Sequence, residues 1–527
     1  MNRSSKGGRP NAPVAPGLRE EGSRAALILI GAFALARLAL DLSLSLGADE
    51  AYTVAVSRRL ALSYFDHPPL HQWLAHFSAE LFGEGVWIRL PFIALFAVTG
   101  WLLFALTRDL FGARAALWAL FGLNASAFFF ASAGGWVVPD GCLLFTLAAA
   151  ALILAKLFFG APDSGAAWRL WLAAGFWLGL AGLSKYSAIF AALGIALFVA
   201  VSPRQRHWFA HPAPYAAALL ALVLVVPVIV WNYENAWVSL AFQGGRGAPA
   251  GRLRIDLVAA MIAGEIALLT PWIFAPLLGG LIGAVRARGD ERRLFLLCLA
   301  APSIIFFTLA PMWSGRGLPH WPMPGWFFVF PLAGVWISEG WERRFSMRGF
   351  VLGACALLAA LAIVVVIHAN TGWITRFFAL PAGAVDPTLE TLDWSALKSA
   401  PRFAARPAFA VSVKWSDAGK IALALGPGTP VLIFSDDPRG LAFLDSSTKY
   451  LGRDGVIVTP KFKLDSVIAS LRPYFVSLGP PEDLAIGRAG QNEISLALIP
   501  AHGLTRAFPL PYPRSTDAIE PAFKGVP

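Results

Sequence analysis

The chain alternates long apolar runs with short polar connections. Apolar runs of about 20 residues recur through the first two thirds of the sequence. Each run is long enough to cross a hydrocarbon core about 30 Å thick. The pattern predicts a mainly α-helical, polytopic transmembrane bundle of about eleven spans. They are expected near residues 25–46, 87–106, 114–133, 141–160, 168–184, 187–201, 213–232, 256–283, 293–311, 324–340 and 349–368.

The connection after the first span, residues 47–86, has mixed polarity. It is too polar to span a bilayer and too apolar to be a simple loop. Its apolar side chains, within 60–65 and 74–82, suit short helices that lie in the membrane interface. Pro68-Pro69 is expected to separate these helices and to set the angle between them.

The composition changes after residue 368. Prolines mark a connecting stretch, at positions 381, 387, 401 and 407. A helical pattern follows at 416–425, then β-rich runs at 431–434, 456–459 and 475–478, with a turn at Asp436-Asp437-Pro438. These features predict a small α/β domain over 369–527, joined to a transmembrane domain over 25–368.

Composition supports a membrane protein. The chain has 57% hydrophobic and 14% charged residues, whereas soluble chains carry roughly 25% charged residues. A net charge of +11 is also typical of nucleic-acid partners, but here the basic residues lie in short loops on the N-terminal side of the bundle. This predicts a cytoplasmic N-terminus, with a disordered tail over 1–24, and a C-terminal domain outside the membrane. The three cysteines lie in apolar runs, so no disulfide framework or thiolate metal site is indicated.

Polar residues of the types that serve in catalysis and ligand binding are expected on the outer side. Asp49 and Glu50 follow the first span directly, and Asp66 and His67 precede Pro68-Pro69. An exposed carboxylate beside a bilayer can accept a proton from a substrate hydroxyl. A positive group nearby can hold a lipid-linked phosphate as charge develops on it. The alternative is that Asp49-Glu50 is only a polar helix end.

Each of five further outer residues has two alternative roles. Asp140 is either a second site carboxylate or a helix N-cap. Lys185 is either a phosphate ligand or a lysine that extends to the membrane surface. Arg246 and Arg316 lie among glycines, where flexible loops suit recognition of a phosphate or a sugar acid, or carry ordinary solvated charge. His320 belongs either to a sugar-stacking site or to an interfacial aromatic belt.

Three charged residues lie inside predicted spans. Arg37 and Asp41 are four residues apart on one helix face, which favours a structural ion pair. Glu265 is either a cavity-facing group or a hydrogen-bonded structural carboxylate. No phosphate-cradling P-loop, HExxH, Cys-pair metal site or GxSxG occurs in the sequence. Nucleotide hydrolysis and serine hydrolase chemistry are therefore not indicated.

The motifs together resemble the lipid-dependent family-39 glycosyltransferases of the GT-C fold. This family includes protein O-mannosyltransferases and bacterial enzymes that decorate lipid A. The resemblance covers roughly residues 25–345, and 369–527 matches loosely through TrpSerAspAlaGlyLys. The motifs, in family order, are AspGluAlaTyr (49–52), TyrPheAspHisProPro (64–69), TrpValValProAspGly (136–141), GlyLeuSerLysTyrSer (182–187), ProValIleValTrpAsn (227–232), GlyGluIle before Pro271, and HisTrpPro (320–322).

The resemblance implies a reaction. A polyprenyl-phosphate-linked sugar is the donor, and an envelope glycolipid, polysaccharide or protein is the acceptor. Transfer proceeds with inversion on the outer side of the bacterial inner membrane. No cofactor is predicted, a divalent metal remains an alternative, and the sugar and acceptor are not named by the sequence.

The resemblance also implies roles for individual residues. Asp49 matches the catalytic base, Glu50 its companion and Asp140 a second acidic position. His67 stands where aminoarabinose transferases have a lysine on the lipid phosphate, and Lys185 matches the family's basic position. The remaining expected substrate-binding residues are Tyr52, Asp66, Arg246, Arg316 and His320. The departures from the family pattern are Thr53-Val54, where many relatives carry aromatic residues, and Glu265, where many carry glutamine.

A transporter or flippase of a lipid-linked sugar is the alternative function, because it too needs a bundle with polar groups that face a cavity. Transporters of this kind place such groups near mid-membrane and often contain repeated halves. In this sequence the polar residues gather at the outer face and no repeated half is found. The pattern therefore favours the transferase.

Overall fold

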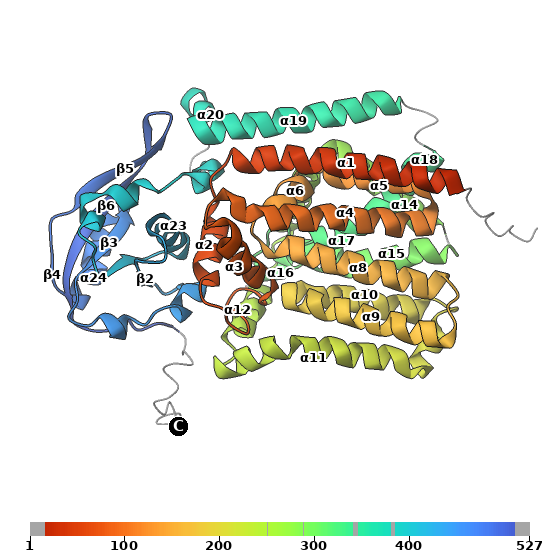
Figure 1. Cartoon of the computed structure of the whole chain (residues 1–527), viewed down its shortest axis with the longest axis horizontal. Helices are drawn as coiled ribbons and strands as arrows, with labels where there is room; N and C mark the ends of the chain where they lie inside the picture. The colour runs from red at the N-terminus through yellow and green to blue at the C-terminus, as the bar shows by residue number, and fades with distance from the viewer. Residues whose placement is uncertain (1–15, 250, 288, 341–345, 381–384, 512–527) are drawn as a thin grey trace, which may run out of the picture.

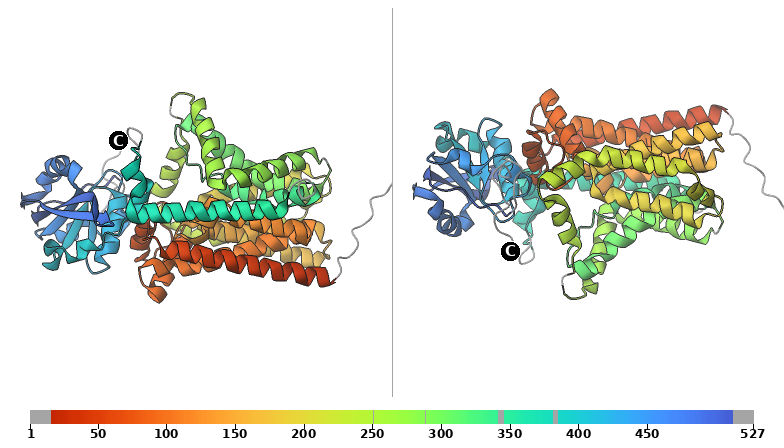
Figure 2. Two further views of the ribbon diagram at one scale, coloured as in Figure 1. Left: turned by 90° about the horizontal axis from the view of Figure 1, so that it is seen from above. Right: turned by 90° about the horizontal axis from the view of Figure 1, so that it is seen from below.

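The computed structural model describes residues 16–249, 251–287, 289–340, 346–380 and 385–511. A bundle of long helices carries a six-stranded sheet domain at one end (Figure 1). Two further views show the same arrangement from other sides (Figure 2). We call the end of the bundle that bears the sheet the domain end, and the opposite end the far end. Most of the predicted tail over 1–24 lies outside the described residues.

The predicted multi-pass membrane bundle is confirmed. Within the described ranges, seven helices are long and apolar enough to cross a membrane, or nine if each of two bent helix pairs forms one span. The seven are α1 (Pro16–Leu42), α4 (Leu90–Phe111, after the 3-10 turn η1, Val86–Arg89), α8 (Pro139–Phe159), α9 (Ser164–Ser184), α11 (Pro212–Glu234), α15 (Glu291–Leu309) and α19 (Met347–Thr371).

The predicted count of eleven spans is not confirmed. The run at 187–201 forms the shorter helix α10 (Ile189–Val201), and 324–340 is split into α17 (Met323–Phe327) and α18 (Phe330–Glu339). Two other runs are bent: α5 (Ala113–Asn124) meets α6 (Ala127–Phe130) and α7 (Ser132–Gly135) at 82°, and α13 (Ile255–Leu269) meets α14 (Pro271–Arg286) at 108°.

The sharper bend has a local cause. Thr270 adopts a positive φ of 65° between the two helices, and Pro271 follows it. Proline has no backbone N–H to continue the preceding helix, and it disfavours the helical conformation in the residue before it. A continuous apolar composition therefore does not make 256–283 a straight span.

The 47–86 connection contains two short helices, α2 (Ala48–Ser57) and α3 (Leu70–Phe82). The prediction of a helix over 60–65 is wrong. The helix that precedes Pro68-Pro69 is α2, which ends at Ser57. Its start is set by Glu50, whose side chain accepts a hydrogen bond from the backbone N–H of Gly47 (2.9 Å). Pro69 stands immediately before α3, as the Pro-Pro pair predicts.

The sheet domain confirms the predicted C-terminal α/β unit. Its strand order is β2-β1-β3-β6-β4, with β5 paired to β6. β1 runs parallel to β2 and β3, whereas β3 and β6 are antiparallel. The strands are β1 (Phe409–Ser412), β2 (Val431–Ile433), β3 (Gly455–Pro460), β4 (Phe475–Leu478), β5 (Glu482–Arg488) and β6 (Gln491–Leu504), with helices α23 (Trp415–Leu425) and α24 (Leu464–Leu471). The strands β1, β5 and β6 were not predicted.

Short helices complete the described chain. They are η2 (Tyr186–Ala188), η3 (Arg206–Ala210), α12 (Val238–Gly247), α16 (Pro311–Ser314), α20 (Trp373–Phe377), η5 (Pro387–Thr391), α21 (Ala396–Ser399), α22 (Pro401–Ala404), η6 (Arg439–Phe443), η7 (Ser447–Tyr450), η8 (Lys461–Lys463) and η9 (Arg472–Tyr474).

The sheet domain is packed directly on α2 through α23 (Figure 1). A Cβ atom at Gly419 would lie 2.7 Å from the backbone nitrogen of Tyr52, and one at Gly440 would lie 2.6 Å from its hydroxyl. The buried Lys420 donates hydrogen bonds to the carbonyls of Leu46 (2.6 Å) and Leu392 (2.9 Å). Small residues and one buried cation therefore fix the domain against the helix that carries Asp49.

The predicted Arg37–Asp41 ion pair is wrong. Arg37 donates instead to the carbonyl of Phe130 (2.6 Å) and to Asn124 Oδ1 (3.1 Å). The buried carboxylate of Asp41 has no hydrogen-bond donor among the described residues. Helix spacing allowed the pair, but the opposing backbone of α6 attracts the guanidinium, and a Cβ at Gly135 would overlap the carboxylate (1.9 Å from Oδ2).

Candidate active site

Charged side chains from segments far apart in sequence meet at the domain end. We call this set the polar cluster. It is supplied by α2, the 58–69 connection, the start of α8, the end of α9, α12, the 315–322 connection and η6. Its members are Asp49, Glu50, Tyr52, Asp66, His67, Asp140, Lys185, Arg246, Arg316, His320 and Arg439. The structure thus brings together all ten predicted site residues and adds Arg439.

Asp49 is the accessible carboxylate of the cluster. Its side chain is exposed, and in the described part of the chain no donor hydrogen-bonds to it and no cation pairs with it. The protein that surrounds it on its other sides nevertheless raises its pKa, and the positive charge of Arg439 only partly opposes this shift. A carboxylate with a raised pKa and no partner is a stronger proton acceptor than an ordinary aspartate.

Glu50, the next residue, is buried and hydrogen-bonded, in contrast to the exposed Asp49. Arg89 donates to both of its oxygens, from Nε (2.8 Å) and from a terminal nitrogen (2.5 Å), and the backbone N–H of Val137 donates as well (3.1 Å). Glu50 and Arg89 are each only 2% exposed. Glu50 therefore anchors the start of α2 and leaves its neighbour, Asp49, at the accessible surface.

Tyr52 and Asp66 link the bundle to the sheet domain. The Tyr52 hydroxyl donates to Asp66 Oδ2 and accepts from the backbone N–H of Gly440 (2.8 Å). Arg439 lies 3.7 Å from the other oxygen of Asp66. Burial raises the pKa of Asp66 to about 6, against the opposing effects of Arg439 and the Tyr52 hydrogen bond.

Asp140 and Lys185 form an ion pair, with Lys185 Nζ 2.9 Å from Asp140 Oδ1. Asp140 is the second residue of α8 rather than its N-cap, a position held by Val138. Lys185 points to Asp140 rather than along the membrane surface. The two charges largely neutralise each other, so this pair supplies little excess charge to the cluster.

The two histidines of the cluster are neutral near pH 7. Burial, together with the positive charges of nearby residues, lowers the pKa of His67 well below its usual value. His320 stacks on Phe128 at a centroid distance of 6.3 Å, and burial lowers its pKa to about 4. Neither ring provides a permanent positive charge for a phosphate.

Arg246 provides the uncompensated positive charge. It lies at the end of helix α12, not in the predicted flexible loop, and its guanidinium carbon sits 4.3 Å from the centroid of Phe242. Its hydrogen bond to Gln243 Oε1 is long, at 3.5 Å, and no described carboxylate lies within 4.0 Å of it. Arg316 is exposed in the 315–322 connection and acts on Arg246 as a like charge.

Glu265 lies apart from the cluster. It accepts hydrogen bonds from Thr308 and from the indole of Trp326, both at 2.7 Å. This contact ties α13 to α15 and α17, which is the structural one of the two predicted alternatives. Among the described residues, no group of three or more His, Cys, Asp or Glu side chains is placed to hold a metal ion.

Two contributors to the site were not predicted. Arg89 begins an apolar run and Arg439 follows a turn in a different domain, so neither stands in a recognisable motif. The only local signal is that Arg89 is a lone charge at the start of a long apolar stretch, where a buried partner is required.

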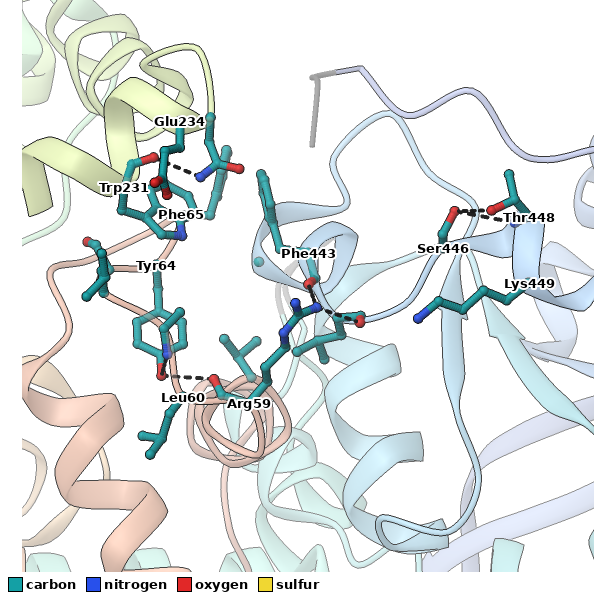
Figure 3. A pocket seen from close by; sticks show the side chains of 17 residues that line it. Arg59, Leu60, Tyr64, Phe65, Trp231, Glu234, Phe443, Ser446, Thr448 and Lys449 are labelled. Carbon is teal, nitrogen blue, oxygen red and sulfur yellow. Dashed lines mark hydrogen bonds between the residues drawn. The ribbon is translucent and has the colours of Figure 1, made fainter. Parts of the chain in front are cut away.

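A cavity of about 440 Å³ opens beside the polar cluster (Figure 3). Its walls come from the end of α2, the 59–65 connection, the end of α11 and the 440–449 segment. Aromatic rings of Phe65, Trp231 and Phe443 line it together with the charged Arg59 and Lys449. Phe65 and Gly440 are immediate neighbours of cluster residues, so the cavity and the cluster share a wall.

Comparisons with known proteins show which sequences and folds the chain resembles. Residues 66–231 match the family model described as dolichyl-phosphate-mannose-protein mannosyltransferase. The lipid A galacturonosyltransferase RgtD of Rhizobium johnstonii is 26% identical over 328 residues, which cover 60% of this chain and 66% of that protein.

Solved structures show the fold. The apo structure of ArnT from Cupriavidus metallidurans aligns with a TM-score of 0.62 and 17% identity, over 90% of this chain and 97% of that one. The structure of the same protein bound to undecaprenyl phosphate aligns with a TM-score of 0.59 and 17% identity, over 92% and 98%. The chain is therefore similar to the dolichyl-phosphate-mannose-protein mannosyltransferase family over residues 66–231 and shares the fold of ArnT, which agrees with the GT-C fold that the sequence motifs predict.

Proposed function

We propose that this protein transfers a sugar from a polyprenyl-phosphate donor to an envelope glycolipid of the lipid A type, with inversion at the anomeric carbon. Asp49 acts as the general base. The observation that carries the proposal is the exposed carboxylate of Asp49, which has no hydrogen-bond or ion-pair partner among the residues that the structure describes, in a cluster with an arginine that no described carboxylate pairs. The named activity of the RgtD relative, a lipid A galacturonosyltransferase, supports the same class of acceptor.

The chemistry requires a proton acceptor beside the attacking oxygen. Asp49 takes the proton of the acceptor hydroxyl as that oxygen bonds to the anomeric carbon, while the bond to the donor phosphate breaks. The raised pKa of Asp49 makes its carboxylate a better base. Glu50 holds Asp49 in place through Arg89 and does not itself take the proton.

The leaving group is a lipid phosphate, and its growing negative charge needs a positive partner. Lys185 is paired with Asp140, and His67 is neutral. Arg246 is therefore the first candidate for the phosphate. The ArnT structure with undecaprenyl phosphate supports a lipid-phosphate ligand for this fold.

The acceptor is assigned to the cavity that shares a wall with the cluster. Aromatic rings and hydroxyl, amide and cationic groups line it, and such surfaces suit a sugar that carries anionic groups. Leu60 and Leu62 are exposed at this cavity. A glycolipid could therefore keep its acyl chains in the membrane while its head group reaches Asp49.

The orientation follows from the charges. The junctions of α4 with α5 and of α8 with α9, which carry Arg108, Arg114 and Lys156, lie at the far end (Figure 1). We assign this end to the cytoplasm and the domain end, with its active site, to the periplasmic side of the bacterial inner membrane.

The test uses purified full-length protein in lipid vesicles with synthetic polyprenyl-phosphate sugars and extracted lipid A. Transfer by the wild-type protein, and its loss in a folded Asp49→Asn variant, is the expected result. Equal transfer by both proteins would refute the role of Asp49. If neither transfers sugar but labelled polyprenyl-phosphate sugar crosses the vesicle bilayer, the protein is a transporter and the proposal fails.

A further inference from the structure

Arg439 has an unusual backbone conformation for its residue type. It lies at the start of η6, in the turn after β2, with a φ of +47°. Non-glycine residues rarely adopt this left-handed region, and such strain persists only where surrounding contacts impose it. Strained residues of this kind gather at ligand sites. The strain at Arg439 therefore marks the surroundings of its side chain as a candidate ligand site.

The side chain of Arg439 crosses the boundary between the two domains. Its guanidinium carbon lies 3.9 Å from the ring centroid of Trp415, within the sheet domain. It also lies 5.7 Å from the ring centroid of Phe242 in α12, and 3.7 Å separates a terminal nitrogen from Asp66. The following residue, Gly440, donates to Tyr52. The turn is thus held against the polar cluster from two sides.

Arg246 approaches the same ring. Its guanidinium carbon is 4.3 Å from the centroid of Phe242, so two arginines from different domains lie over one phenyl ring. Two like charges so close repel each other unless an anion lies between or beside them. Arg439 already lies near two carboxylates, Asp437 (3.5 Å) and Asp66 (3.7 Å), and Asp66 is also engaged by Tyr52. Arg246 has no described carboxylate within 4.0 Å, so a further anion beside the two guanidiniums would meet its unpaired charge.

We propose that Arg439 of the sheet domain and Arg246 of α12 form a two-arginine clamp on one anionic group of the lipid-linked donor. That group is the donor phosphate or, in a sugar acid, the carboxylate. The phosphate is a tetrahedral oxyanion and the carboxylate a planar one, and arginine binds either of them through two hydrogen bonds. The proposal rests on the proposed function and extends it, because it makes the sheet domain a part of the donor site.

The chain offers a matched pair of variants. Arg439→Gly removes the side chain at a φ of +47°, a conformation that glycine adopts without strain, so the substitution adds no backbone strain. Arg406→Gly makes the same change at a φ of +55°, in an exposed arginine of the same domain outside the polar cluster. Both variants lose one positive charge, from a partly buried site in the polar cluster for Arg439 and from an exposed site for Arg406. Thermal unfolding of both proteins serves as the control for folding.

Three measurements use the full-length protein: steady-state transfer from polyprenyl-phosphate galacturonic acid, transfer from polyprenyl-phosphate galactose, and equilibrium binding of undecaprenyl phosphate. We expect Arg439→Gly to raise KM by about 10- to 100-fold for at least the acidic donor, with little change in kcat. Arg406→Gly should match the wild type. A loss in all three measurements assigns the clamp to the phosphate, and a loss with the acidic donor alone assigns it to the sugar carboxylate.

Two results separate this proposal from the proposed function. Transfer by Arg439→Gly with the KM values and the binding of Arg406→Gly would overturn the clamp and leave the transferase intact. A wild-type protein that transfers no sugar, yet binds undecaprenyl phosphate more tightly than Arg439→Gly, would overturn the transferase and leave the clamp intact.

Discussion

Charged side chains have different environments at the two ends of the helical bundle. At the far end, ion pairs are partly exposed: Arg293 pairs with Asp290 (3.1 Å) and with the more distant Glu339 (2.7 Å), and Arg108 pairs with its neighbour Asp109 (3.1 Å). At the domain end, charges come from seven separate segments, and within the described chain three of these charges, Asp49, Arg246 and Arg316, have no ion-pair partner.

This difference distinguishes charges that stabilise the fold from charges that mark a binding site. Pairs between exposed neighbours stabilise a fold by about 0–1 kcal/mol and require no ligand. Charges held together without counter-ions are unfavourable unless a ligand completes them, so they mark a binding site. Sequence alone does not show the difference, because both ends contain acidic and basic residues in short connections.

Loss of the base is expected to have the largest effect. Asp49→Asn should lower kcat by about 10²–10⁴-fold, because general base catalysis contributes that much. Thermal unfolding should stay near that of the wild type, since no described residue forms a hydrogen bond or ion pair with the Asp49 side chain. The matched far-end change, Asp109→Asn, should leave the rate unchanged. A fall in rate with both variants would place the effect outside the site.

Removal of a buried partner should be the next largest effect. Arg89→Met leaves Glu50 charged, buried and without its bidentate partner, which should lower the free energy of unfolding by about 3–5 kcal/mol. Arg293→Met, at the far end, removes a pair whose glutamate is mostly exposed and should cost about 0–1 kcal/mol. Chemical unfolding in one detergent compares them; equal losses would contradict the contrast between the ends.

Close packing at the domain end should be sensitive to one methyl group. A Cβ at Gly135 would overlap the Asp41 carboxylate, so Gly135→Ala should destabilise by about 1–3 kcal/mol. Gly353, on the surface of α19, has no atom within 4 Å of the added Cβ, and Gly353→Ala should instead stabilise by about 0.5–1 kcal/mol. Melting temperatures of the two variants should therefore move in opposite directions.

The smallest expected effect is a shift in pH dependence. Asp49 must be deprotonated to act, and its pKa lies above the ordinary 3.8, so kcat/KM should fall as pH decreases through that raised value. Arg439 lowers this pKa by its positive charge. Arg439→Gly should therefore move the acid limb to higher pH, whereas Arg406→Gly should not. An acid limb that moves to lower pH would contradict the assignment of Asp49 as the base.

Local sequence patterns predict much of the architecture. Long apolar runs predict membrane helices because a helix satisfies its own backbone hydrogen bonds in lipid. The runs at 431–434 and 456–459 predict strands because β-branched residues suit a pleated sheet. The motif order also predicts the family and ten of the residues in the polar cluster.

The tertiary structure alone decided the state of each charge. Helix spacing predicted that Arg37 would pair with Asp41, but the backbone of a neighbouring helix competes for the guanidinium. Adjacent residues, Asp49 and Glu50, take different environments because only one faces Arg89. Arg439 reaches the site from a different domain through a strained turn. Whether a charge is paired, buried or available depends on contacts between distant segments, which no local pattern encodes.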